Sequence, residues 1–208
     1  MSRMNSRCKA SRRLALALFL LGLCAGPALA HLPIPPKKGA VGRKAVQTVV
    51  PDFTLVDQRG KPFRFATTRG KLVLVTFVFT TCPDLCPLLT AKFAAIQRAL
   101  EKDERKNYVL LSITTDPEKD TPAVLKAYSE QYKADSGRWF FLTGSAKELK
   151  RVWDGFGVTV RQSGGEIQHT ALTTLIDYQG VRRFDYYTDK WQEKEILKDI
   201  ASLTPPHQ

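Results

Sequence analysis

Two cysteines four residues apart are the part of this sequence best suited to chemistry. Cys82 and Cys86 lie in the segment FVFTTCPDLCP, residues 77–87, and a proline follows each of them. On a helical turn their Cα atoms would be ~6 Å apart, which permits disulfide exchange. Two thiolates also suit Cu(I), and one imidazole would complete a three-coordinate site. The pair therefore predicts copper binding or thiol redox chemistry.

One histidine in the body of the chain could supply that imidazole. The other two, His31 and His207, stand outside the segments with a clear folding pattern. His169 stands just before the β-branched segment ALTTLID, residues 171–177, with Thr170 between them. We expect this strand to begin beside the cysteines, which makes His169 the candidate third ligand.

The residues on either side of the cysteines predict a strand followed by a helix. The run LVLVTFVF, residues 72–79, is typical of a central strand buried on both faces. Apolar residues at helical spacing predict a helix that runs to residue 102. Pro83 fits the first position of this helix and would place Cys82 at or near the N-cap. Backbone amides and the helix dipole would then lower the pKa of the Cys82 thiol.

The rest of the chain completes an α/β pattern. A hairpin is expected at residues 51–65, and the elements after the first helix are a strand at 108–114, a helix from Thr121–Pro122, a strand at 139–145, a helix around 149–156, a hairpin about 178–180 and a helix ending near 203. Asp116 and Asp120 are expected to organise the turn before Thr121 and to cap the helix, and a position of Asp116 near the metal is the alternative. This order is that of the thioredoxin fold. We therefore predict a thioredoxin-like fold, a central mixed sheet flanked by helices, with an N-terminal hairpin extension.

The first 30 residues have the pattern of a secretory signal. Five basic residues precede the apolar run Leu14–Leu23, and a small-residue site ends at Ala30. The run is shorter than the roughly 20 residues of a membrane-spanning helix. An uncleaved anchor is one alternative, and a lipoprotein at Cys24 is disfavoured by Leu23. We predict a cleaved signal (1–30), a flexible tether (31–46) and one domain (47–208) in the bacterial periplasm, anchored to the inner membrane only if the signal is retained.

Removal of this segment would lower the formal net charge from +12 to about +7, since five basic residues leave and no acidic one does. The remaining positive charge is dispersed, which argues against nucleic-acid binding. Two of the four cysteines would leave as well, so Cys82 and Cys86 become a lone pair in a compartment where disulfides persist. A disulfide between them would close too short a loop to stabilise the fold appreciably. His31 would become the N-terminus, where its amine and imidazole offer an alternative copper chelate.

A peroxidase is disfavoured. Peroxiredoxins carry a threonine or serine three residues before the attacking cysteine and a proline seven residues before it. Phe79 and Val75 occupy these positions here.

From about residue 47 to 203 the chain resembles the Sco/SenC family, in the segments TCPDLCP (81–87), DPEKDTP (116–122), Trp139 to Gly144, and His169-Thr170 ahead of a strand ending at Asp177. The family consists of thioredoxin-fold copper proteins that help assemble the Cu(A) centre of cytochrome c oxidase. The resemblance implies that Cys82, Cys86 and His169 bind one Cu(I) or Cu(II).

It also implies a partner and an alternative activity. The metal would pass to the copper-binding subunit of the oxidase or to another copper protein, with membrane association only through that partner or an uncleaved N-terminus. In the alternative, the same cysteines form a thiol–disulfide oxidoreductase that reduces the partner's metal-binding cysteines.

Overall fold

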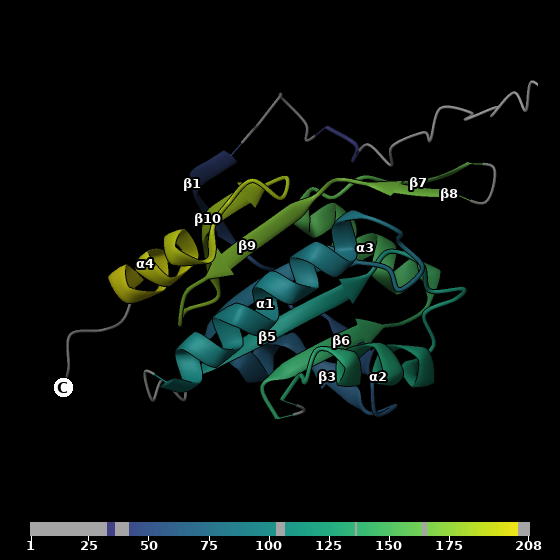
Figure 1. The fold of residues 1–208 in the computed structure, drawn as a ribbon, viewed down its shortest axis with the longest axis horizontal. Helices are drawn as coiled ribbons and strands as arrows, with labels where there is room; N and C mark the ends of the chain where they lie inside the picture. Colours follow the sequence, from purple (N-terminus) through teal and green to yellow (C-terminus); the bar gives the residue numbers. More distant parts are fainter. Residues whose placement is uncertain (1–32, 36–41, 103–106, 136, 164–165, 204–208) are drawn as a thin grey trace, which may run out of the picture. The chain divides into compact units, whose positions relative to one another are not determined.

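The computed structural model describes residues 33–35, 42–102, 107–135, 137–163 and 166–203 (Figure 1). The expected signal peptide and most of the expected tether up to residue 41 lie outside the described residues. Within the described part, none of the helices has the length and apolar character needed to cross a membrane.

A large mixed sheet forms the centre of the fold. In the described chain it has eight strands in the order β1-β10-β9-β4-β5-β6-β2-β3. These are β1 (Gly42–Val49), β2 (Thr54–Asp57), β3 (Pro62–Arg64), β4 (Leu72–Val78), β5 (Tyr108–Thr114), β6 (Trp139–Thr143), β9 (Leu172–Ile176) and β10 (Val181–Tyr187). The strands β7 (Val160–Ser163) and β8 (Glu166–His169) pair in a separate two-stranded sheet. The helices are α1 (Leu85–Lys102), α2 (Pro122–Gln131), α3 (Ala146–Phe156) and α4 (Glu193–Leu203), and a short 3-10 helix spans Phe65–Thr68.

Strand β4 is the expected central strand, with all seven residues buried. It pairs in parallel with β5 and antiparallel with β9. Because successive side chains of a strand point to opposite faces, Leu72 and Leu74 join the core with α1, α2 and α4, whereas Val73 and Val75 join the core with α3. Burial on both faces explains why the strand reads as a continuous apolar run.

The connections confirm the predicted thioredoxin-like class. Helix α1 links the parallel strands β4 and β5, and α2 links the parallel strands β5 and β6. The antiparallel pair β9 and β10 and the helix α4 follow. The hairpin β2–β3 extends the sheet by pairing β2 with β6, as expected for the N-terminal extension.

The expected tether is wrong for its last residues. Residues 42–46 belong to β1, which pairs antiparallel with β10 from Gly42 opposite Tyr187 to Val49 opposite Val181. The side chains of β1 are mostly exposed. An edge strand with polar and charged side chains has the composition of a linker, and only its backbone pairing shows the difference.

Candidate metal centre

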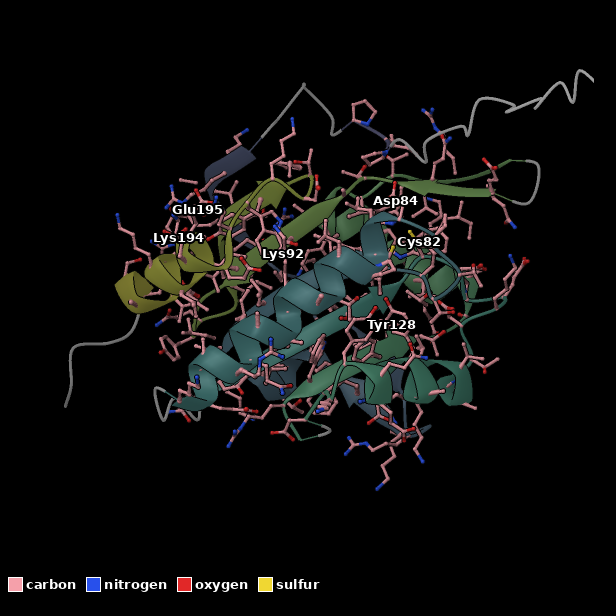
Figure 2. All side chains as sticks on the ribbon, in the orientation of Figure 1. Cys82, Asp84, Lys92, Tyr128, Lys194 and Glu195 are labelled. Carbon is pink, nitrogen blue, oxygen red and sulfur yellow. The ribbon has the colours of Figure 1, made fainter. Side chains whose placement is uncertain are left out.

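Residues 79–84, which connect β4 to α1 and are here called the cysteine loop, lie where the ends of three strands meet. The loop follows β4, and the N–H of Cys82 donates a hydrogen bond to the carbonyl oxygen of Phe79 at 3.2 Å. The pairing of Val78 with Thr114 places the end of β5 at the same edge of the sheet. The antiparallel pairing of Thr76 with Thr173 brings the start of β9 there too. Figure 2 shows Cys82 and Asp84 at the N-terminal end of α1.

The structure brings the two cysteines into contact. They are free thiols, Cys86 is fully buried and Cys82 is 5% exposed. The backbone N–H of Cys86 donates to the Cys82 sulfur at 3.4 Å. Both side chains pack with Phe79 and Ile167 in a small apolar cluster, here called the cysteine cluster, which also contains Val78. The site is thus largely closed to solvent.

The predicted helix start is wrong, because α1 begins at Leu85 rather than at Pro83, so Cys82 lies near the N-cap and not at it. A helix starting at Pro83 would put Pro87 beyond its first turn, where the ring clashes with a carbonyl and the missing N–H breaks a hydrogen bond. A start at Leu85 places Pro87 within the first turn, where no N–H is needed. The amides of Asp84, Leu85 and Cys86 still donate to the Cys82 sulfur.

The pKa values of the two thiols are shifted in opposite directions. A hydrogen bond from the Cys86 thiol and those from the backbone amides lower the pKa of Cys82 from 9.0 to about 6, against the opposing effect of burial. The same hydrogen bond, together with burial, raises the pKa of Cys86. At neutral pH the site therefore holds the Cys82 thiolate beside the Cys86 thiol.

This assignment predicts one acidic thiol in the reduced protein. The ultraviolet absorbance of the thiolate should rise with a midpoint near pH 6 and an amplitude of one sulfur. A Cys86→Ala variant should shift the midpoint upward, because it removes the largest contribution to the lowered pKa. Two thiols that both titrate near 9 in the wild type would contradict the assignment.

His169 is the last residue of β8 and is 6% exposed. Its Nδ1 lies 3.0 Å from the carbonyl oxygen of Thr170. A carbonyl oxygen only accepts, so this hydrogen bond requires a proton on Nδ1 and, in the neutral ring, puts the lone pair on Nε2. The ring packs edge-on against Phe79, with centroids 5.9 Å apart.

The three predicted ligands are therefore only partly assembled. Cys82 and Cys86 are together, and His169 contacts Phe79, a member of the cysteine cluster. Across the described ranges, however, no three His, Cys, Asp or Glu side chains form a group that could hold a metal ion. The two sulfurs, which are in contact, are donors suited to a soft metal ion.

A buried network that the sequence did not reveal fixes the cysteine loop. Asp120 is fully buried and accepts hydrogen bonds from the hydroxyls of Thr80 and Thr114, each at 2.5 Å. The backbone N–H of Thr80 also donates to Asp120. Burial raises the pKa of Asp120. The residue thus ties the loop before Cys82 to the end of β5, which only the pairing of the two strands makes evident.

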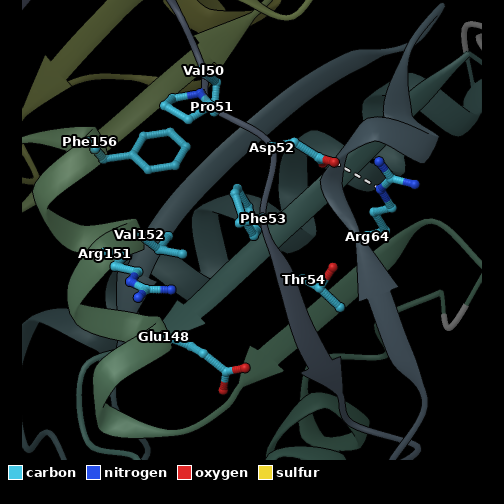
Figure 3. Close-up of a pocket in the computed structure, with 11 residues that line it drawn as sticks. Val50, Pro51, Asp52, Phe53, Thr54, Arg64, Glu148, Arg151, Val152 and Phe156 are labelled. Carbon is cyan, nitrogen blue, oxygen red and sulfur yellow. Dashed lines mark hydrogen bonds and ion pairs between the residues drawn. The ribbon is translucent and has the colours of Figure 1, made fainter.

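A pocket of about 710 Å³ lies between β2 and α3, and the cysteines do not line it (Figure 3). Phe53 and Phe156 form part of its wall. Its acidic side chains have structural partners, because Asp52 pairs with Arg64 at 2.8 Å and Glu148 caps α3 through Ser145. These interactions account for the two acidic residues of the pocket without a ligand.

Fold and site together define a thioredoxin-fold protein with a thiolate–thiol pair after its central strand. The SCO1/SenC family model matches residues 41–205, and the chain belongs to this family. It is 34% identical over 154 residues to the "SCO2-like protein" of Rickettsia felis, an alignment that covers 71% of this chain and 73% of the relative.

Two solved structures add information about relatives. ScoI of Bradyrhizobium japonicum, solved with copper bound, is 29% identical with a TM-score of 0.63, covering 79% of this chain and all of that one. BsSco, described as a cytochrome c oxidase assembly protein with a disulfide switch, is 29% identical with a TM-score of 0.68, covering 79% and 98%. The copper expected from the sequence is therefore found in a structural relative.

Proposed function

We propose that this protein is an exported metallochaperone that binds copper at Cys82, Cys86 and His169 and delivers it to a cuproenzyme. The Cu(A) centre of cytochrome c oxidase is the proposed destination. The observation that carries the proposal is the Cys82 thiolate held against the Cys86 thiol at the end of β4. The copper-bound relative and the oxidase assembly role of BsSco support it.

The donor set suits Cu(I), which prefers soft thiolate ligands. Cys82 is ready to bind, since its pKa is already low. Cys86 must lose its proton, so copper binding should release protons as metal binding to thiols generally does. His169 would contribute Nε2, because Nδ1 donates to the carbonyl of Thr170.

The position of β8 allows His169 to approach the sulfurs. His169 ends a strand of the two-stranded β7–β8 sheet, whose ladder is separate from that of the main sheet. A shift of this hairpin would leave the hydrogen bonds among β4, β5 and β9 intact. In a three-coordinate site an incoming thiolate can add before an existing ligand departs, which provides a route for transfer.

Copper loading of a His169→Ala variant tests the proposal. Under anaerobic conditions the reduced wild type should bind one copper per chain. In the variant, the Cu(II)–thiolate absorption should be lost or shifted, because one ligand is missing. Gln168→Ala is the matched control, since Gln168 is the exposed neighbour of His169 on β8. Absence of tight copper binding, or identical spectra in both variants and the wild type, would contradict the proposal.

The sulfur pair also favours a second candidate, a thiol–disulfide reductase. The Cys82 thiolate would attack a partner disulfide, forming a mixed disulfide and releasing one partner thiolate. Cys86 would then lose its proton and attack the Cys82 sulfur. The products are a Cys82–Cys86 disulfide and a reduced partner dithiol. This reaction requires neither His169 nor copper. A wild type that binds no copper tightly would therefore favour the reductase.

A further inference from the structure

A small pocket adjoins the cysteine loop and has a charged group that the copper site does not use. Its volume is about 210 Å³, and its walls come from three segments of the chain. Thr81 and Pro83 flank Cys82, Asp116 and Lys119 follow β5, and Ile167 belongs to β8. The pocket is smaller than the roughly 300–1,000 Å³ of sites for drug-sized ligands, so it has room for one side chain.

Asp116 gives this pocket a buried acceptor. The residue is 3% exposed, and its Oδ2 has no hydrogen-bond partner in the described part of the protein. Buried polar atoms are nearly always hydrogen-bonded, so such an exception requires an explanation. The nearest cation is the Nζ of Lys119, 3.8 Å away, on a side chain that is 53% exposed. The Lys119 ammonium lies at the outer limit of an ion pair and leaves the Oδ2 atom without a short contact.

The remaining walls define the complementary group. Phe79 and Ile167 are apolar and buried, whereas Glu166 adds an exposed carboxylate at the rim. A lysine or arginine side chain matches this arrangement, because its stem is apolar and its head donates hydrogen bonds. Since Thr81 and Pro83 flank Cys82, such a side chain would belong to the polypeptide that reaches the Cys82 sulfur.

We propose that this pocket recognises a cationic residue beside the cysteine of the partner protein, with Asp116 as its main acceptor. The inference rests on the proposed function, because it concerns the partner of the same sulfur site. The Lys119 ammonium stays 3.8 Å from Oδ2 on a half-exposed side chain, which leaves room for the partner's cation to form the short contact. Recognition of this kind would orient the partner thiol toward Cys82.

Disulfide exchange with short peptides tests the proposal on the full, reduced chain. Each peptide carries one cysteine joined through a disulfide to thionitrobenzoate, a good leaving group. The Cys82 thiolate attacks the peptide sulfur, the peptide–Cys82 disulfide forms and the coloured thiolate leaves. A peptide with arginine next to its cysteine should react about 10-fold faster than one with glutamate, as expected for a charge-assisted hydrogen bond.

Substitutions in the pocket show whether its residues cause the difference between the two peptide rates. Asp116→Asn should bring the ratio of the two rates close to one. Asp154→Asn, the same change at an exposed residue of α3, should leave the ratio unchanged. If Asp116→Asn does not fold, Glu166→Gln should still lower the ratio. Equal rates for both peptides in the wild type, an equal effect of Asp154→Asn, or no effect of Glu166→Gln would each overturn the pocket as the recognition site.

Copper stoichiometry, measured on the same preparations, separates this proposal from the previous one. Asp116→Asn should retain copper, and loss of copper would assign Oδ2 to the metal site and overturn the peptide pocket. A wild type that binds copper but reacts equally fast with both peptides would overturn the pocket alone. A wild type that prefers the arginine peptide but binds no copper would overturn the chaperone function alone.

Discussion

Cys82→Ser and Cys86→Ser variants are each expected to lose tight copper binding. Removal of one thiolate leaves a single sulfur, and a serine hydroxyl is a hard, weakly acidic group that suits Cu(I) poorly. The affinity should fall by more than about 100-fold, the upper limit for the loss of a mere outer-shell partner. Copper content after dialysis against a competing chelator measures the effect.

The matched control is Leu88→Ala, which alters an exposed side chain on the same helix. It should retain one copper per chain. The two cysteine variants should remain folded, because the main cores contain neither sulfur. Full copper retention by either cysteine variant, with the fold intact, would exclude the proposed two-sulfur site.

Asp185→Ala is expected to destabilise the fold by about 3–5 kcal/mol, the range for removing one partner of a buried ion pair. Asp185 pairs with Arg182 at 2.7 Å, and both side chains are less than one-tenth exposed. Asp185 also accepts a hydrogen bond from the Thr174 hydroxyl at 2.7 Å. The substitution leaves the Arg182 guanidinium buried without its counter-ion. Chemical denaturation monitored by circular dichroism measures the change in the free energy of unfolding.

Asp154→Ala provides the control for this prediction. Asp154 pairs with Lys150 at the same distance of 2.7 Å, but both side chains are more than 60% exposed. Exposed pairs contribute only ~0–1 kcal/mol, since solvent screens them. A loss of stability as small in Asp185→Ala as in Asp154→Ala would show that the Arg182–Asp185 pair is solvated in solution.

Much of the fold could be predicted from local patterns. Strand β4 was identifiable because burial on both faces requires an uninterrupted apolar run, and α2 because Thr121 caps it and Pro122 opens it. His169 was a candidate third ligand because it is the one histidine within the segments that have a clear folding pattern, and the family resemblance implied the same three residues. These signals are local because strand burial, helix capping and the spacing of two thiols depend on residues close together in the chain.

Features that depend on partners far away in the chain became evident only from the folded structure. Residues 42–46 form a strand because β10 is available to pair with them, and nothing in their own composition requires it. Asp120 holds Thr80 only because β4 and β5 lie side by side. The pocket at Asp116 likewise exists only where the cysteine loop meets β8. The reactive groups could be identified from residue types and spacing alone. Which of these groups meet depends on the folded backbone, because contacts between distant segments follow from strand pairing and packing rather than from local propensity.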